Sequence, residues 1–298
     1  MLVDANLGTL ELDPAAGYAV SKLDLGYPEA RAATVARVNA PGADDFTAYY
    51  GARAVSLEIT VWPTEERSAG AALDLLRAFT SPQRRPYLYL DRSEVDVGWD
   101  LYPSSYGDNG YGDQVSDRRR LLLRGETMSA PVETRGMVRV QCQWVAPEGV
   151  LEGEAEASAL VPSEGTEAGR QYQRTYPLVY AETPVIGSVV VTNIGGEPAA
   201  PVIRFHGPVT DPALHNLTTG EVVRFSGLTL VAGQWVDVDV KRATVRINSD
   251  PNQSAYGLLD LVDSTLWWLP AGQSTLRFTA GSREPGSYSE ITWRPVWL

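Results

Sequence analysis

Alternation of apolar and polar residues, with a period of two, is the feature that most constrains the fold of this chain. Between Val236 and Val240, three valines alternate with two aspartates. Successive side chains of a β-strand point to opposite faces, so the pattern predicts a strand with one buried and one solvated face. Gly233 and Asn248 flank this strand as turn residues. The stretch 228–298 continues in the same way and predicts strands joined by short turns.

The same pattern predicts strands in the rest of the chain. Over 52–61, Val55, Leu57, Ile59 and Val61 alternate with other residues. Further predicted strands lie at 87–90, 118–124, 137–145, 189–192 and 201–206, with a hairpin over 217–225. Many short strands separated by turns are typical of an all-β sandwich.

Residues 64–81 break this pattern and predict one amphipathic helix. Apolar residues recur there at helical spacing, at Ala69, Ala72, Leu73, Leu76 and Phe79. Thr64 is expected to cap the N-terminus of the helix, with Glu65 and Glu66 in its first turn. Pro82 ends the segment. A lone helix of this length is marginal in water, so we expect its apolar stripe to cover a sheet.

The length and a shift in composition indicate the domain organisation. A chain of 298 residues suggests one large domain or two ordinary ones. Over 148–170, glutamates are mixed with Gly, Ala and Ser, which is typical of a solvated connection. We therefore predict an N-terminal β domain over 1–147, an acidic connection over 148–170 and a C-terminal domain over 171–298.

The charge and the first residues limit the classes of function. The chain has 37 acidic and 25 basic residues and a formal net charge of −12. Non-specific nucleic-acid binding needs clustered Lys and Arg against phosphates, so we expect no nucleic-acid binding. The start lacks a basic segment followed by an apolar run, and no apolar run approaches the roughly 20 residues that span a bilayer. We expect synthesis in a cytoplasm, without membrane insertion.

Several motifs follow one another in an order that resembles a known family. A strand Val245-Arg-Ile-Asn248 precedes the turn Leu269-Pro-Ala-Gly272, the strand Thr275-Leu-Arg-Phe278 and a final strand with Trp293-Arg294. Upstream, residues 193–208 read Asn-Ile-Gly-Gly-Glu-Pro-Ala-Ala-Pro-Val-Ile-Arg-Phe-His-Gly-Pro, and the strand from Tyr50 to Val61 precedes the helix. This order resembles the distal tail proteins of long, non-contractile-tailed bacteriophages, over nearly the whole chain.

The resemblance implies both a fold and a role. The fold is mainly β: an N-terminal β-sandwich with one packed helix, then a C-terminal galectin-like β-sandwich. The role is a non-enzymatic one, in which N-terminal domains form a hexameric hub ring at the virion tail tip and join the tail tube to the baseplate. The implied partners are other copies of the chain, the tail tube protein, the tape measure protein, the tail-associated hub protein and receptor-binding or other baseplate proteins. The loop over 96–117 and the connection over 148–170 are longer than the family pattern.

An aromatic loop and the arginines after it are the candidates for a subunit or partner contact. These residues are Trp99, Tyr102, Tyr106, Tyr111, Arg118, Arg119 and Arg120. Tyr, Trp, Ser, Gly and Asn are typical of adaptable binding loops, and the same rings would also serve to pack the loop onto its own domain. The arginines would either pair with acids of a neighbour or line a solvated strand edge.

The sequence contains no motif for catalysis or for binding a cofactor or metal, and we predict no such residues. His206 and His215 with Asp211 match no known ligand spacing. Residues 108–113 lack the distal glutamate of an EF-hand and are interpreted as a polar turn. The one cysteine, Cys142, lies in a predicted strand and is expected to be a buried, inert thiol.

Two alternatives to the structural hub remain open at this point. The first is a protein that binds host surface glycans, because tryptophans can stack on sugars. The tryptophans concerned are Trp235, Trp267, Trp268, Trp293 and Trp297, of which several must belong to the core. The second is a glycosidase, which would need two carboxylates about 5–10 Å apart across a cleft.

Overall fold

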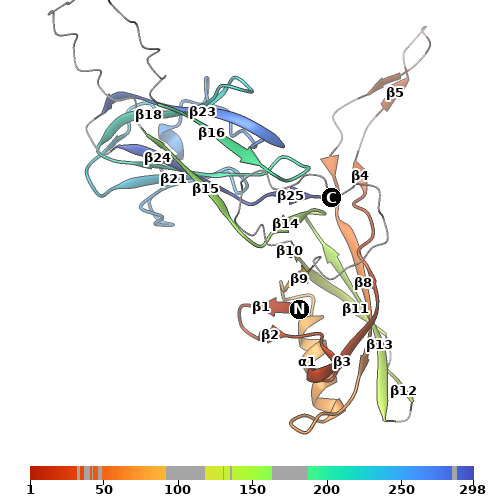
Figure 1. The fold of residues 1–298 in the computed structure, drawn as a ribbon. Helices are drawn as coiled ribbons and strands as arrows, with labels where there is room; N and C mark the ends of the chain where they lie inside the picture. Colours follow the sequence, from red (N-terminus) through yellow and green to blue (C-terminus); the bar gives the residue numbers. More distant parts are fainter. Residues whose placement is uncertain are drawn as a thin grey trace, which may run out of the picture. The chain divides into compact units, whose positions relative to one another are not determined.

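Strands dominate both halves of the chain, as the alternating pattern predicts. The computed structural model describes residues 1–31, 34–36, 41, 43–45, 49–91, 118–129, 131–134, 136–162, 187–283 and 287–298. These residues form two units, Met1–Ala155 with Trp297–Leu298, and Glu156–Val296. Beside the strands, the described residues contain one α-helix and two 3-10 helices, Pro14–Ala16 and Tyr256–Leu258 (Figure 1). The predicted mainly-β fold class with one helix is therefore confirmed.

The first unit contains two larger sheets and two short hairpins. Its strands are β1 (Leu2–Asp4), β2 (Gly8–Leu10), β3 (Tyr18–Asp24), β4 (Ala30–Arg31), β5 (Thr34–Ala36), β6 (Ala43–Asp45), β7 (Tyr49–Tyr50), β8 (Arg53–Val61), β9 (Tyr87–Asp91), β10 (Arg118–Leu122), β11 (Arg124–Met128), β12 (Val132–Thr134), β13 (Met137–Ala146), β14 (Leu151–Gly153) and β25 (Val296–Trp297). One sheet has the order β2-β1-β9-β10-β14-β25, and the other has the order β11-β13-β8-β3 with β12 beside β13. The hairpins pair β4 with β7 and β5 with β6.

The long pairing of β8 with β13 supplies much of the core of the first unit. Every residue of β8 is paired, from Arg53 opposite Ala146 to Val61 opposite Val138. On β8 the odd-numbered residues are buried, as the alternation predicts. On β13 the buried positions include Cys142 and Trp144. One face of this sheet therefore belongs to the core, and the other carries polar side chains.

The single helix, α1 (Ala69–Phe79), is shorter than the predicted 64–81. Ser68 caps its N-terminus, because its side chain accepts a hydrogen bond from the backbone N–H of Ala71. The prediction of Thr64 as the cap, with two glutamates in the first turn, was wrong. Thr64 instead closes a turn with the residue three positions later, through backbone hydrogen bonds in both directions.

The apolar stripe of α1 covers the core of the first unit, as predicted. Ala72, Leu76 and Phe79 belong to the same buried cluster as the apolar residues of both larger sheets. Two hydrogen bonds attach the helix backbone to the β11-β13-β8-β3 sheet. The Tyr18 hydroxyl donates to the carbonyl of Ala72 at 2.9 Å, and Trp144 Nε1 donates to the carbonyl of Phe79 at 3.2 Å.

The second unit is a sandwich of two five-stranded sheets. Its strands are β15 (Ala157–Pro162), β16 (Ser188–Asn193), β17 (Val202–His206), β18 (Val209–Asn216), β19 (Glu221–Arg224), β20 (Thr229–Leu230), β21 (Trp235–Asp239), β22 (Thr244–Ile247), β23 (Gly272–Arg283) and β24 (Tyr288–Trp293). One sheet has the order β15-β24-β17-β21-β22, and the other has the order β16-β23-β18-β19 with β20 beside β18.

Phenylalanines from both sheets form the centre of this sandwich. The ring of Phe205, on β17, lies 5.7 Å from that of Phe225 and 5.8 Å from that of Phe278, on β23. Trp267 and Trp293 are buried as well, which agrees with the expectation that several tryptophans are core residues. Each buried ring stabilises the sandwich by roughly a few kcal/mol through the apolar area it removes from water.

Part of the predicted acidic connection over 148–170 forms strands instead. Leu151 on β14 and Val161 on β15 are buried, and β15 pairs with β24 over six residues. The prediction was wrong over 151–153 and 157–162 because Leu151 and Val161 reach the cores and Glu152 pairs with Arg120 of the neighbouring strand. Residues 163–170 lie outside the described part of the chain.

None of the described helices has the length and apolar character that crossing a membrane requires.

Gly125, on β11, provides a test of how closely α1 and the sheet approach each other. A Cβ atom at Gly125 would lie 1.8 Å from the carbonyl oxygen of Thr80, the C-cap of α1. We expect Gly125→Ala to destabilise the protein by about 3 kcal/mol, because backbone would have to shift. Gly70→Ala, in the open first turn of α1, is the matched control and should stabilise by about 0.5–1 kcal/mol. Urea unfolding followed by circular dichroism measures both, and equal stabilities would contradict this packing.

Cys142 provides a second test, of the burial of β13. Burial raises the pKa of the Cys142 thiol to about 11, against a smaller opposing effect of its hydrogen bond to Thr80. Because only the thiolate reacts with disulfide reagents, the native protein at pH 8 should not react with Ellman's reagent. The same protein in denaturant should release one equivalent of thionitrobenzoate. Rapid reaction of the native protein would show that β13 is open to solvent.

Candidate functional site

The residues predicted as subunit or partner contacts fall into two groups. Trp99, Tyr102, Tyr106 and Tyr111 lie outside the described residues. Arg118, Arg119 and Arg120 begin β10. β10 lies inside its sheet, between β9 and β14, so the alternative of a solvated strand edge was wrong. It was wrong because strand order depends on pairing with distant segments, which local sequence does not specify.

Two of these arginines pair with acids of their own chain. Arg118 Nε donates to Asp91 Oδ2 at 3.0 Å, and Arg120 Nη2 donates to Glu152 Oε2 at 2.9 Å. In both pairs the partners lie directly opposite each other on neighbouring strands. The hydrogen bond and the charge of Asp91 raise the pKa of Arg118. For Arg120, burial alone would lower the pKa, but the hydrogen bond and the charge of Glu152 outweigh burial and raise it.

Two arginines of β10 also contact aromatic rings of the first unit. The Arg119 guanidinium lies 4.1 Å from the ring centroid of Trp297, which packs against the core of this unit. The Arg120 guanidinium lies 4.7 Å from the ring of Tyr87. Such cation–π contacts contribute roughly 0.5–1 kcal/mol each where they are exposed. The arginines thus stabilise their own unit, and their predicted contact with a neighbouring copy stays a prediction.

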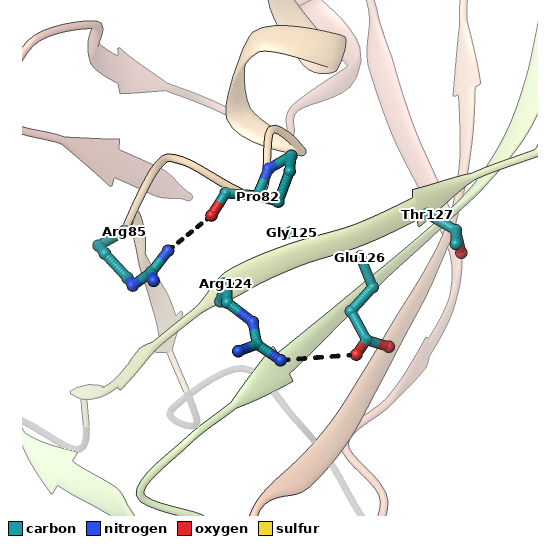
Figure 2. A pocket seen from close by; sticks show the side chains of 6 residues that line it. All are labelled: Pro82, Arg85, Arg124, Gly125, Glu126 and Thr127. Atoms are coloured by element: carbon teal, nitrogen blue, oxygen red, sulfur yellow. Dashed lines mark hydrogen bonds and ion pairs between the residues drawn. The ribbon is translucent and has the colours of Figure 1, made fainter.

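A wide hollow of about 680 Å³ lies beside α1 and β11 and is lined by Pro82, Arg85, Arg124, Gly125, Glu126 and Thr127 (Figure 2). Arg85 Nη1 donates to the carbonyl of Pro82 at 2.8 Å, and Arg124 Nη2 lies 3.8 Å from Glu126 Oε1. These lining residues include no histidine or cysteine.

The two histidines lie on different sheets of the second unit. His215, on β18, has its Nε2 2.9 Å from Thr279 Oγ1, and burial together with two nearby arginines lowers its pKa. His206, on β17, lies against Tyr288. Within the described ranges, no group of three or more His, Cys, Asp or Glu side chains is placed to hold a metal ion.

The outer face of the β15-β24-β17-β21-β22 sheet carries three rings side by side, Tyr288, His206 and Trp235, here called the aromatic row. They stand opposite one another on β24, β17 and β21. His206 stacks on Tyr288 with ring centroids 4.2 Å apart, and the Trp235 centroid lies 6.4 Å from that of His206. Trp235 Nε1 donates to Ser249 Oγ at 3.2 Å. This bond fixes the orientation of the indole ring.

Beside the aromatic row lies a second row of four charged residues, Glu290, Arg204, Asp237 and Arg246, here called the charge ladder. They stand opposite one another on β24, β17, β21 and β22, and their signs alternate. Arg204 Nε donates to Asp237 Oδ1, and its guanidinium lies 5.5 Å from the Trp235 centroid. Ser249 Oγ also donates to Asp237. The ladder is therefore a row of donors and acceptors whose two central members are paired and whose formal charges balance.

The sequence predicts some of the outward residues of this face but not how they are arranged across the strands. The alternation in each strand already assigned Arg204, His206 and Asp237 to the face away from the core. Their meeting with one another and with β24 depends on the registers of the β17–β21 and β17–β24 pairs, and no local pattern encodes those registers.

Comparison with known proteins relates this chain to phage tail proteins. Residues 194–297 match the family model described as siphovirus-type tail component, C-terminal domain. No curated protein sequence matches the chain. The crystal structure of Dit from phage SPP1, described as a paradigm of hub adsorption apparatus in Gram-positive infecting phages, has a TM-score of 0.60 at 13% identity, with 94% of each chain covered. Two structures of the activated phage p2 baseplate, with Ca and with Sr, have TM-scores of 0.45 and 0.46 at 10% identity, covering 93% of this chain and 90% of theirs.

The family match lies in the second unit except for its last residue, and the likeness to SPP1 Dit extends over both units. The resemblance inferred from the order of the motifs is thereby confirmed. Residues 194–297 thus match the siphovirus-type tail component family, and the chain as a whole shares the fold of SPP1 Dit.

Proposed function

We propose that this chain is a structural hub protein of a siphophage tail tip, which assembles as a hexameric ring between the tail tube and the baseplate. The family match supports a place in the tail, and the description of SPP1 Dit as a hub supports the hub role. The proposed partners are the tail tube protein, the tape measure protein, the tail-associated hub protein and receptor-binding or other baseplate proteins. The role is mechanical and involves no catalysis by this chain.

The proposed ring is supported by a set of exposed large side chains near the two short strand pairs of the first unit. Tyr27 is 72% exposed and Tyr49, on β7, is 68% exposed. Val35 on β5 and Tyr50 on β7 are also exposed. β4 and β5 lie one after the other beyond the end of β8 (Figure 1), and the described residues from Tyr27 to Tyr50 are here called the arm. Exposed aromatic and apolar side chains on successive short segments of the chain favour a protein–protein contact.

A closed ring also needs a second, different surface on each copy, because a rotational contact joins two unlike patches. The outer edge of β3 is a suitable candidate. β3 pairs with β8 on one side, and no strand among the described residues pairs with its other side. Val20 and Leu23 on this strand are exposed. An open strand edge with apolar side chains is a template for binding another chain.

The double variant Tyr27→Asp/Tyr49→Asp tests the role of the arm in assembly. Two buried negative charges in a subunit contact would be strongly unfavourable, so we expect loss of hexamers while the thermal unfolding of each copy is unchanged. Light scattering coupled to size exclusion gives the mass, and negative-stain images show the rings. The matched control is Leu261→Asp on the second unit, at a residue that is 65% exposed, and it should assemble normally.

Two results would contradict this proposal. One is a wild-type chain that remains monomeric at every concentration and also in the presence of its tail tube protein. The other is a double variant that forms rings as well as the wild type and the Leu261→Asp control do.

A further inference from the structure

The aromatic row and the charge ladder together make a surface with the chemistry of a saccharide site. We propose that the outer face of the β15-β24-β17-β21-β22 sheet binds a neutral pyranose sugar. Nothing in the hub role requires these two rows, and this surface goes beyond it, since sugar binding does not depend on ring assembly. Four observations carry the proposal: the fixed indole, the hydrogen-bonding ladder, the neutrality of the ladder and a hollow at its end.

Trp235 supplies the stacking surface. It is half-buried, its Nε1 is bonded to Ser249, and its backbone N–H donates to Asn248 Oδ1 at 3.0 Å. Asn248 and Ser249, which hold Trp235, both have positive φ, so the backbone of this turn is strained at these two residues. A pyranose presents apolar C–H groups on one face, and a large rigid ring covers that face with little loss of conformational entropy.

The charge ladder supplies hydrogen-bonding groups beside the indole. Carboxylates of Glu290 and Asp237 accept, and the Arg204 guanidinium donates through several N–H groups. Each sugar hydroxyl both donates and accepts, so neighbouring hydroxyls match a carboxylate beside a guanidinium. Arg204 and Asp237 are already held by one another, and Asp237 also by Ser249, which reduces the ordering that binding would otherwise require.

The charge of the ladder selects the class of sugar. Two acids and two arginines alternate in sign, so their formal charges sum to zero. An anionic sugar would lie as close to Glu290 and Asp237 as to the arginines and would gain little net attraction. A neutral sugar avoids this repulsion and uses both kinds of group.

A shallow hollow of about 250 Å³ lies at the β22 end of the ladder, where Arg246, Ser254 and Tyr256 are among its lining residues. Ser254 bridges to Arg246 and thereby extends the sheet beyond β22. The hollow lies just below the roughly 300 Å³ at which small-molecule sites begin, so it suits one sugar ring rather than a larger ligand. Arg246 belongs to both features and joins them into one surface.

A protein partner fits this face less well than a sugar does. A stable protein interface covers roughly 800 Å² per side around an apolar centre. The centre of this face is occupied by paired charges instead. The two most exposed large apolar side chains of the second unit, Leu261 and Val262, lie on the loop before β23.

The test is calorimetric titration of the full chain with maltotriose, cellotriose, chitotriose and lactose, and with an oligogalacturonate as the anionic comparison. We expect at least one neutral sugar to bind, and Trp235→Ala to weaken that binding at least about tenfold, a change of about 1.4 kcal/mol. Trp268→Ala is the matched control, because Trp268 is 48% exposed but lies outside both rows. Glu290→Gln keeps the shape of the ladder, removes one charge and should also weaken binding. Thermal unfolding of each variant shows that the fold is retained.

Several outcomes would overturn the proposal. These are no binding of any neutral sugar below about 10 mM, binding of the oligogalacturonate alone, or equal losses in the Trp235→Ala and Trp268→Ala variants. None of them bears on ring formation, which is measured separately by mass and by imaging. Failure of the sugar site and failure of the hub role are therefore distinguishable.

Discussion

The antiparallel pairing of β8 with β13 is the constraint on which the first unit depends. Every residue of β8 has a partner on β13, and the buried positions of the two strands fall on the same face. A slip by one residue would turn each of these side chains to solvent. The loss of buried apolar area therefore strongly favours the observed register. The helix is attached to this pair through the Trp144 indole, and Gly125 on the next strand allows the end of the helix to approach.

The same alternation gives the β15-β24-β17-β21-β22 sheet of the second unit a buried face and an outer face. Inside, Phe205 and its neighbours fill the space between the sheets. Outside, the adjacent residues Arg204 and His206 take their places in the charge ladder and the aromatic row. One strand, β17, thus contributes to both the core and the proposed sugar-binding face, because its side chains alternate between them.

Several reactive or charged side chains of the described residues are engaged within the fold. The thiol of Cys142 is buried and its pKa is raised, the histidines lie on separate sheets, and the arginines of β10 are engaged within their own unit. The features proposed for contact with other molecules are the exposed tyrosines and the β3 edge of the first unit and the outer sheet face of the second. An assembly role for the first and a recognition role for the second are compatible with one another.

The sequence predicts many of the strands, because burial of one face imposes a period of two that is visible in residues such as Val55 to Val61, but the prediction missed β14 and β15. It also determined that one helix covers a sheet, although Ser68 replaced Thr64 as its cap, since several polar residues there suit a cap equally well. Which strands are neighbours depends on the tertiary structure. Strand order placed Arg118 to Arg120 inside a sheet, drew Leu151 and Val161 out of an acidic stretch into the cores, and aligned Trp235 with His206 and Tyr288. The physical reason is that alternation is a local property of each strand, whereas register and strand order arise from contacts between segments that are distant in the sequence.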